Sequence, residues 1–298
     1  MKSTLFFLLF CTASWAQTDG YSVNTDGSKT YYRIFGSGKP MLVINGGPGM
    51  NSNGFEALAR ELSKHRMAIL YDQRGTGKSV LPKLSPETVS MRLMVDDIES
   101  LRKSLKIKNW DVLGHSFGGM LASFYATEFP DRIDRMILSS SGGVDLDLLS
   151  YVGGRIQSKL NPVQRDSLRY WNAKIEKGDT TYATRLGRGR NLAPAYVFNP
   201  KYVPSLAKRL TQGNAELNQL IWDDLREIGF DCAPKLKKYQ KPVLIIQGKD
   251  DIIKPNTAEI AHRAFRNSEV VLLDDCGHYG WLDAEAEYFA AIGTFLQP

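Results

Sequence analysis

The sequence predicts an α/β fold in which helices cover both faces of a mostly parallel sheet. Short runs of apolar and β-branched residues alternate along the chain with longer segments of helical period. These runs are continuously apolar rather than alternately apolar and polar, which is typical of strands buried on both faces. With 298 residues, 43% of them hydrophobic, the chain is long enough to bury a large core around such a sheet.

The predicted elements follow one another in a regular order. The apolar runs that predict strands cover residues 30–35, 41–46, 67–72, 110–116, 135–141, 243–251 and 270–278. Segments with apolar residues at i, i+3, i+4 and i+7 predict helices over residues 55–65, 89–105, 119–130, 256–267 and 283–296. The chain ends in the last of these amphipathic segments.

The alternation stops in one long segment, residues 142–240. This segment has no comparable strand run, but it carries helical patterns at 151–160, 162–177 and 215–230. We therefore predict a helical cap inserted between two strands of the sheet. The core around the sheet is expected to consist of residues 17–141 and 241–298.

The first 16 residues have the pattern of an export signal. Lys2 precedes the apolar run from Leu5 to Phe10, and Ser14-Trp15-Ala16 is an A-x-A-like cleavage site. The run is much shorter than the roughly 20 apolar residues of a membrane-spanning helix. We expect cleavage after Ala16 and export to the periplasm or the medium. The alternative is a lipoprotein with lipid on Cys11, although the bulky Phe10 precedes it.

The charge of the chain does not predict a nucleic-acid partner, and no segment after the leader is apolar enough to predict a membrane span. Residues 145–240 carry 16 Lys and Arg against 10 Asp and Glu, an excess of 6 that equals the net charge of +6. The one dense basic cluster, Arg185–Arg190, lacks interleaved aromatic residues, so a solvated surface is the simplest interpretation. The oligomeric state is left open.

Two cysteines, Cys232 and Cys276, remain after removal of the leader. In an oxidising compartment they could form one disulfide. The alternative is that they are two small buried apolar residues that stay free. Their spacing does not indicate a metal site.

The segment Tyr71–Val80 contains a Gly-Lys-Ser like that of a phosphate-binding loop. The loop pattern G-x-x-x-x-G-K-[ST] requires an earlier glycine, and Asp72 stands in that position. An aspartate would repel phosphate, and its Cβ would obstruct the turn. A phosphate-binding loop is therefore not predicted here, and the rest of the chain has to indicate the role of the segment.

The clearest catalytic pattern is GHSFGG, residues 114–119. It lies between a predicted strand and a predicted helix, the context in which G-x-S-x-G forms a nucleophile elbow. Such an elbow projects the serine Oγ above the sheet. Ser116 is the predicted nucleophile.

A serine hydroxyl needs a base, and the base needs an acid that orients it. The order in this architecture is Ser, then Asp or Glu, then His. His278 follows a strand in a glycine-containing loop and is the predicted base, whereas His262 lies inside an amphipathic helix. Asp250 and Asp251 both follow the preceding strand, and their positions alone do not distinguish them.

An oxyanion hole requires N–H donors near the nucleophile. The residue after the serine, Phe117, supplies one predicted donor. The other is expected from the loop NGGPGM, residues 45–50, where we select Gly47 because glycines permit close backbone approach.

Together, the motifs NGGPG, DQRGTGKS, NWDVLGHSFGG, GKDD and CGHYGWLDA resemble the α/β-hydrolase fold, and in particular the proline iminopeptidase-like serine aminopeptidases. The resemblance runs from about residue 31 to residue 296, apart from the insertion. It implies that Lys78 belongs to a structural turn beside the active site. The family pattern has the acid four residues before a proline, here Pro255, which selects Asp251.

The sequence departs from the family pattern in two motifs. Asn45 replaces the usual histidine, and His115 and Phe117 flank the serine where glycine and tryptophan are usual. The departures leave the fold and the triad unchanged. They bear on peptide specificity, because the elbow is similar to that of general hydrolases.

An aminopeptidase needs a carboxylate to recognise the substrate's cationic N-terminus. The cap offers acidic candidates and two aromatic residues that could enclose a proline ring. The acids are Glu176, Glu216, Asp223, Asp224 and Glu227, and the aromatic residues are Trp171 and Trp222.

The sequence leaves three hypotheses. The first is an exported serine aminopeptidase that releases N-terminal proline or a small residue from short peptides through an acyl-enzyme. The second is a carboxylic-ester or lactone hydrolase with the same triad, and the third is a non-catalytic binding protein on this scaffold. The two enzyme hypotheses require a small peptide or ester substrate and no metal or organic cofactor.

Overall fold

The computed structural model describes residues 17–297, so the predicted signal peptide and Cys11 lie outside the described residues. Its centre is an eight-stranded sheet with the spatial order β1-β2-β4-β3-β5-β6-β7-β8. The strands are β1 Thr18–Val23, β2 Lys29–Phe35, β3 Pro40–Ile44, β4 Met67–Tyr71, β5 Trp110–His115, β6 Ile133–Ser139, β7 Val243–Gly248 and β8 Ser268–Leu273. The six strands β3 to β8 are parallel, which confirms the predicted fold class.

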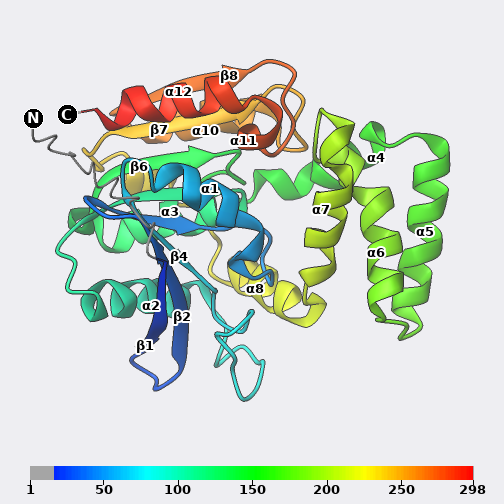
Figure 1. Ribbon diagram of the computed structural model, residues 1–298, viewed down its shortest axis with the longest axis horizontal. Helices are drawn as coiled ribbons and strands as arrows, with labels where there is room; N and C mark the ends of the chain where they lie inside the picture. Colours follow the sequence, from blue (N-terminus) through cyan, green and yellow to red (C-terminus); the bar gives the residue numbers. More distant parts are fainter. Residues whose placement is uncertain (1–16, 298) are drawn as a thin grey trace, which may run out of the picture.

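Helices flank this sheet and form the segment between β6 and β7 (Figure 1). Those outside the insertion are α1 Glu56–Leu62, α2 Met91–Ser104, α3 Phe117–Glu128, α10 Pro255–Ala264, α11 Gly280–Asp283 and α12 Glu285–Leu296. Sequence signals set their ends: the Ser90 side chain, for example, accepts a hydrogen bond from the N–H of Leu93 and begins α2. Within residues 17–297, no helix has the length and apolarity needed to cross a membrane.

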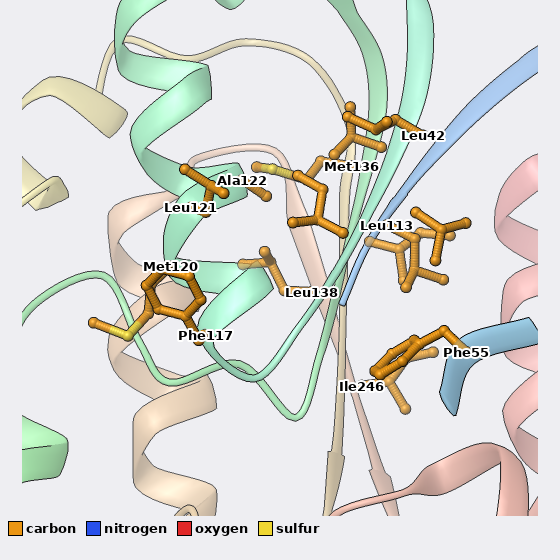
Figure 2. Close-up of a cluster of buried hydrophobic side chains, with 14 of the residues drawn as sticks. Leu42, Phe55, Leu113, Phe117, Met120, Leu121, Ala122, Met136, Leu138 and Ile246 are labelled. Carbon is orange, nitrogen blue, oxygen red and sulfur yellow. The ribbon is translucent and has the colours of Figure 1, made fainter. Parts of the chain in front are cut away.

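The core has two layers, one on each face of the parallel strands. In Figure 2, Phe117, Met120 and Leu121 of α3 lie on one side of the strands, and Phe55 lies on the other. Successive side chains of a strand point to opposite faces, so Gly114 and His115 also face opposite layers. His115 is thereby placed in the layer of Phe55, with the two ring centroids 5.3 Å apart.

The described part of the chain between β6 and β7 is helical. It contains α4 Val152–Lys159, α5 Pro162–Glu176, α6 Tyr182–Leu192, α7 Val203–Arg209, α8 Ala215–Glu227 and α9 Ala233–Leu236. Figure 1 shows α4 to α7 grouped at one end of the molecule, with the C-terminal end of α12 at the opposite end. This helical segment is called the cap below.

Helix α6 is an element that periodicity did not predict, because glycine and arginine interrupt its apolar pattern. The glycines are needed for packing. A Cβ on Gly187 would lie 2.5 Å from the Trp171 ring, and one on Gly189 would lie 2.5 Å from the carbonyl oxygen of Ala207. Gly187 and Gly189 therefore allow α6 to approach α5 and α7 closely.

Strand β1 was also missed, since it lies at the sheet edge with most residues exposed and has no continuous apolar run. It pairs antiparallel with β2. The turn between them contains Asp26-Gly27, with Gly27 at φ +81°, and Asp-Gly is a hairpin signal that could have indicated the strand.

Hydrogen bonds of Asp72 hold the Gly-Lys-Ser turn after β4, to which the family resemblance gave a structural role. The Asp72 carboxylate accepts hydrogen bonds from the N–H of Ser52 at 2.9 Å and from the N–H of Lys78 at 2.9 Å. A Cβ on Gly77 would collide with this carboxylate. The Lys78 ammonium lies over the Tyr31 ring, 4.3 Å from its centroid.

Cys232 and Cys276 are both buried and free. Cys232 precedes α9 in the cap, and Cys276 follows β8. The sequence left open whether the two cysteines form a disulfide or stay free as buried apolar residues, and the structure has them free. Burial also raises the pKa of the Cys232 thiol to about 12, which keeps it unreactive.

We predict that Gly118→Ala destabilises the fold, because its Cβ would lie 2.2 Å from the carbonyl oxygen of Ile44. The expected loss in the free energy of unfolding is about 1–3 kcal/mol, the range of an overpacked core. Gly293→Ala on α12 is the matched control, since no atom lies within 4 Å of its Cβ and the helix should gain up to about 1 kcal/mol. Urea unfolding measures both, and equal stabilities would contradict the packing argument.

Candidate active site

Ser116 occupies a strained turn between β5 and α3. Its backbone has φ +56° and ψ −122°, a region that residues other than glycine rarely adopt. The N–H of Ser116 donates to the Ser139 carbonyl at 3.0 Å, which anchors the turn to β6. A Cβ on Gly114 would lie 2.3 Å from the carbonyl oxygen of Gly118, so only glycine permits the crossing of strand and helix. This is the geometry of a nucleophile elbow.

The backbone N–H groups of Gly47 and Phe117 are the predicted donors of the oxyanion hole, and both are available. Phe117 begins α3, where the first N–H groups have no partner within the helix. Among residues 17–297, neither the Gly47 N–H nor the Phe117 N–H donates to a protein acceptor. The loop lies against the serine, because a Cβ on Gly46 would be 2.6 Å from the Ser116 Cβ.

His278 and Asp251 form a buried pair at the ends of β8 and β7. His278 Nδ1 donates to Asp251 Oδ1 at 2.8 Å, because an ionised carboxylate only accepts. The Asp251 carboxylate also accepts from the Ile253 N–H at 3.0 Å and from Gln247 Nε2 at 2.7 Å. These bonds fix its orientation. Asp250 is partly exposed, and within the described chain its side chain makes no hydrogen bond.

The hydrogen bond between His278 Nδ1 and Asp251 leaves Nε2 as the free acceptor of the imidazole. Ser116 and His278 line the same cavity. No hydrogen bond joins them in residues 17–297, and such bonds in unliganded enzymes are often formed only with substrate. The structure thus pairs His278 with Asp251 and has Ser116 and His278 on the same cavity.

A second histidine, His115, lies beside this pair. The centroids of the His115 and His278 rings are 4.6 Å apart. Burial lowers the pKa of His115 well below its ordinary value, and the charges of His278 and Arg209 lower it further. His115 is therefore neutral and acts as a packing residue against the catalytic imidazole. His262 is exposed on α10, where Nδ1 lies 2.8 Å from Ser268 Oγ.

Arg209 of α7 supports the oxyanion loop from the cap, and sequence reasoning missed it. Its guanidinium is buried, lies over the Phe55 ring and donates from Nη2 to the Gly46 carbonyl at 3.0 Å. It places a positive charge behind the loop that carries Gly47. The two partners are 163 residues apart in the sequence, so no local pattern indicates the contact.

Asp283 in α11 connects the cap to the histidine loop and was also missed. Its carboxylate accepts hydrogen bonds from the N–H groups of Phe198 at 2.9 Å, Asn199 at 3.0 Å and Gly277 at 3.0 Å. Beside it, the His278 N–H donates to the Tyr196 carbonyl at 2.7 Å. The position of the base is therefore tied to the cap segment 196–199.

Ser116 and His278 open into a cavity of about 640 Å³ between the core and the cap. Its cap walls are mainly apolar and include Leu148, Val152, Ile156, Ile175, Leu192 and Trp222. Such a volume is that of a small-molecule site. The cavity is thus accessible to a small substrate at the predicted nucleophile.

The structure places the cap candidates differently from one another. Trp222 and Glu176 line the cavity. Trp171 does not, because its ring packs against Gly187 on α6 and against Tyr170, with ring centroids 5.0 Å apart. The prediction that Trp171 contacts substrate is therefore not supported.

The other acidic candidates of the cap do not line the cavity. Glu216 and Glu227 are exposed on α8, and Asp223 is paired with Arg226 at 2.9 Å. Asp224 Oδ2 accepts the Met91 N–H at 2.7 Å, and burial raises the pKa of that carboxyl. Of the five acids considered, Glu176 alone reaches the cavity.

Within residues 17–297 no group of three or more His, Cys, Asp and Glu side chains is arranged to hold a metal ion.

The parallel sheet, the serine elbow and the helical cap are typical of α/β-hydrolases, and comparison with known proteins identifies the same class. The model of the family described as "alpha/beta hydrolase fold" matches residues 39–285. The chain therefore belongs to the α/β-hydrolase fold family. An α/β-fold family hydrolase from Bacillus anthracis superposes with a TM-score of 0.77 at 19% identity, covering 94% of this chain and 99% of that one.

Sequence relatives narrow this class to proline iminopeptidase-like hydrolases. The proline iminopeptidase of Lactobacillus helveticus is 30% identical over 282 residues, covering 91% of this chain and 95% of the relative. That of Lactobacillus delbrueckii subsp. bulgaricus is 30% identical over 285 residues, covering 90% and 94%. The resemblance inferred from the motifs is confirmed. An esterase from Exiguobacterium antarcticum shares the fold, with a TM-score of 0.71 at 20% identity and coverage of 92% and 98%.

We predict that Asp251→Asn lowers kcat on the order of 10⁴-fold, because an asparagine amide cannot hold the imidazole in the tautomer with Nε2 free. Asp250→Asn is the matched control and should change kcat little, since its side chain is partly exposed. Steady-state kinetics with melting temperatures measure both variants. A larger loss in Asp250→Asn would transfer the role to that residue.

Proposed function

We propose that this chain is an exported serine aminopeptidase that releases N-terminal proline or a small residue from short peptides through an acyl-enzyme. The observation that carries the proposal is the arrangement of Ser116, His278 and Asp251 at the cavity of a proline iminopeptidase-like chain. Export is proposed from the leader-like residues 1–16.

In the first half of the reaction, Ser116 Oγ attacks the scissile carbonyl while His278 Nε2 takes the hydroxyl proton. The N–H groups of Gly47 and Phe117 donate to the oxyanion of the tetrahedral intermediate, and the N-terminus of α3 adds a favourable dipole. His278 then returns the proton to the leaving amine. The buried carboxylate of Asp251 stabilises the imidazolium that forms meanwhile.

In the second half, water attacks the acyl-enzyme carbonyl and gives its proton to His278 Nε2. The same N–H groups hold the second oxyanion. Collapse of this intermediate breaks the bond to Ser116 Oγ, which regains the proton from His278. The products are the free N-terminal residue and the shortened peptide.

Glu176 is the proposed partner of the substrate's N-terminal ammonium. It stands at the end of α5 and is the one acidic candidate that lines the cavity. Trp222 supplies an aromatic wall next to the elbow, with its ring centroid 6.4 Å from that of Phe117. An apolar wall and one carboxylate fit an N-terminal proline or small residue.

A carboxylic-ester or lactone hydrolase is the second candidate. The mainly apolar cap wall and the His115-Ser116-Phe117 elbow favour it, because neither feature requires a charged substrate. The mechanism would be the same, with an alcohol as leaving group. The two candidates therefore differ in the substrate's amine and not in the triad.

The deciding experiment compares prolyl and alanyl arylamides, their N-acetylated forms and short-chain nitrophenyl esters on the purified mature chain. We expect arylamide turnover that is lost on N-acetylation. Ser116→Ala should lower kcat on the order of 10⁴ to 10⁶-fold with the melting temperature unchanged. Ester turnover alone would favour the second candidate, and a loss of only a few-fold in Ser116→Ala would refute the nucleophile.

A further inference from the structure

Two arginines of α6 line the cavity that contains Ser116 and have no role in the mechanism above. Arg185 and Arg188 are three residues apart, so they project from the same face of the helix. Arg190, two residues further on, is exposed and does not line the cavity. The packing of Gly187 and Gly189 against α5 and α7 keeps this face close to the site.

Neither guanidinium is neutralised by the protein. Across residues 17–297, no carboxylate lies within salt-bridge distance of Arg185 or Arg188. Arg188 Nε donates to Asn172 Oδ1 at 2.8 Å, and Asn172 also lines the cavity. Arg185 Nε is buried and has no hydrogen-bond partner. An unpartnered buried donor is costly, so Arg185 is prepared for an acceptor that the described chain does not supply. Arg188 is held by Asn172 through Nε, and its Nη groups make no hydrogen bond within residues 17–297.

The chemistry that satisfies these groups is an oxyanion with two acceptor atoms. Guanidinium binds carboxylate in a bidentate, charge-assisted geometry that is stronger than a neutral hydrogen bond. Glu176 also lines this cavity; its side chain is exposed and has no salt-bridge partner within residues 17–297. A complementary ligand therefore has an anionic end, which pairs with Arg185 and Arg188, and a cationic end, which pairs with Glu176.

We propose that Arg185 and Arg188 bind the free C-terminal carboxylate of the substrate, so that the enzyme selects short peptides with an unblocked C-terminus. This inference rests on the proposed aminopeptidase function, which already assigns the ammonium end to Glu176. A cavity of about 640 Å³ has the size of a small-molecule site, which fits a peptide of a few residues. Amidated peptides lack this carboxylate, and longer peptides carry it further from the scissile bond.

The test compares prolyl-alanine with prolyl-alaninamide, which differ only in the carboxylate, by the rate of proline release. For the unmodified protein we expect kcat/KM to be about 10- to 100-fold higher for the acid, the range of hydrogen bonds to a charged group. Arg185→Gln and Arg188→Gln should remove this preference mainly through KM and leave the amide unchanged. Arg190→Gln is the matched control on the same helix.

Equal turnover of the acid and the amide by the unmodified protein would overturn the proposal without any variant. So would glutamine variants that slow both peptides equally, because that pattern indicates a structural effect. Arg188→Lys should retain part of the preference, since lysine keeps the charge without the bidentate geometry.

A second substrate pair separates this inference from the proposed function. 4-Acetoxybenzoate and 4-acetoxybenzamide are esters whose leaving groups differ in one carboxylate. Turnover of these esters without peptide cleavage would refute the aminopeptidase. In that event, a preference for the benzoate that disappears in both glutamine variants would still support carboxylate binding by the arginines, and no preference would refute it.

Discussion

The backbone of Ser116 is held at φ +56° by its surroundings, and the geometry of the site depends on this turn. Such a conformation costs about 1–3 kcal/mol for a residue with a side chain. It persists because β5, α3 and β3 meet around it with almost no free space, as Gly114, Gly118 and Gly46 show. The same close packing brings the Gly47 loop to the start of α3, so the nucleophile and both oxyanion donors are positioned by one set of contacts.

The loops around the site are held by charged side chains that bond to the main chain. Asp72 accepts N–H groups from Ser52 and Lys78, and Asp251 accepts the N–H of Ile253. Arg209 donates to the Gly46 carbonyl. These loops follow the ends of parallel strands, where backbone N–H and C=O groups no longer have partners in the sheet. Charged side chains supply those hydrogen bonds instead. In the DQRGTGKS segment Asp72 has this function, whereas Arg74 pairs with the carboxylates of Asp26 and Asp97.

Much of the fold was predictable because its signals are local. Continuous apolar runs predicted the strands from β2 to β8, and the elbow and the chain order indicated Ser116 and His278. Asp251 was selected over Asp250 only by the family pattern. Strand β1 was missed because most of its residues are exposed and it has no apolar run. Helix α6 was missed because the glycines that pack it against its neighbours interrupt its apolar pattern. Contacts such as Arg209 with Gly46 could not be predicted, since they join residues 163 positions apart. The orientation of Trp171 likewise depends on a neighbouring helix.

Asp283 has a consequence for how this family can diversify. Its carboxylate joins the histidine loop to cap segment 196–199, while Arg209 joins the cap to the oxyanion loop. The cap is therefore part of the catalytic framework, and it is not an independent lid. Recombination that exchanged the cap between relatives would alter substrate choice and also remove two supports of the reaction machinery. New specificities in such a scaffold should arise more readily by single substitutions within the cavity than by transfer of whole caps.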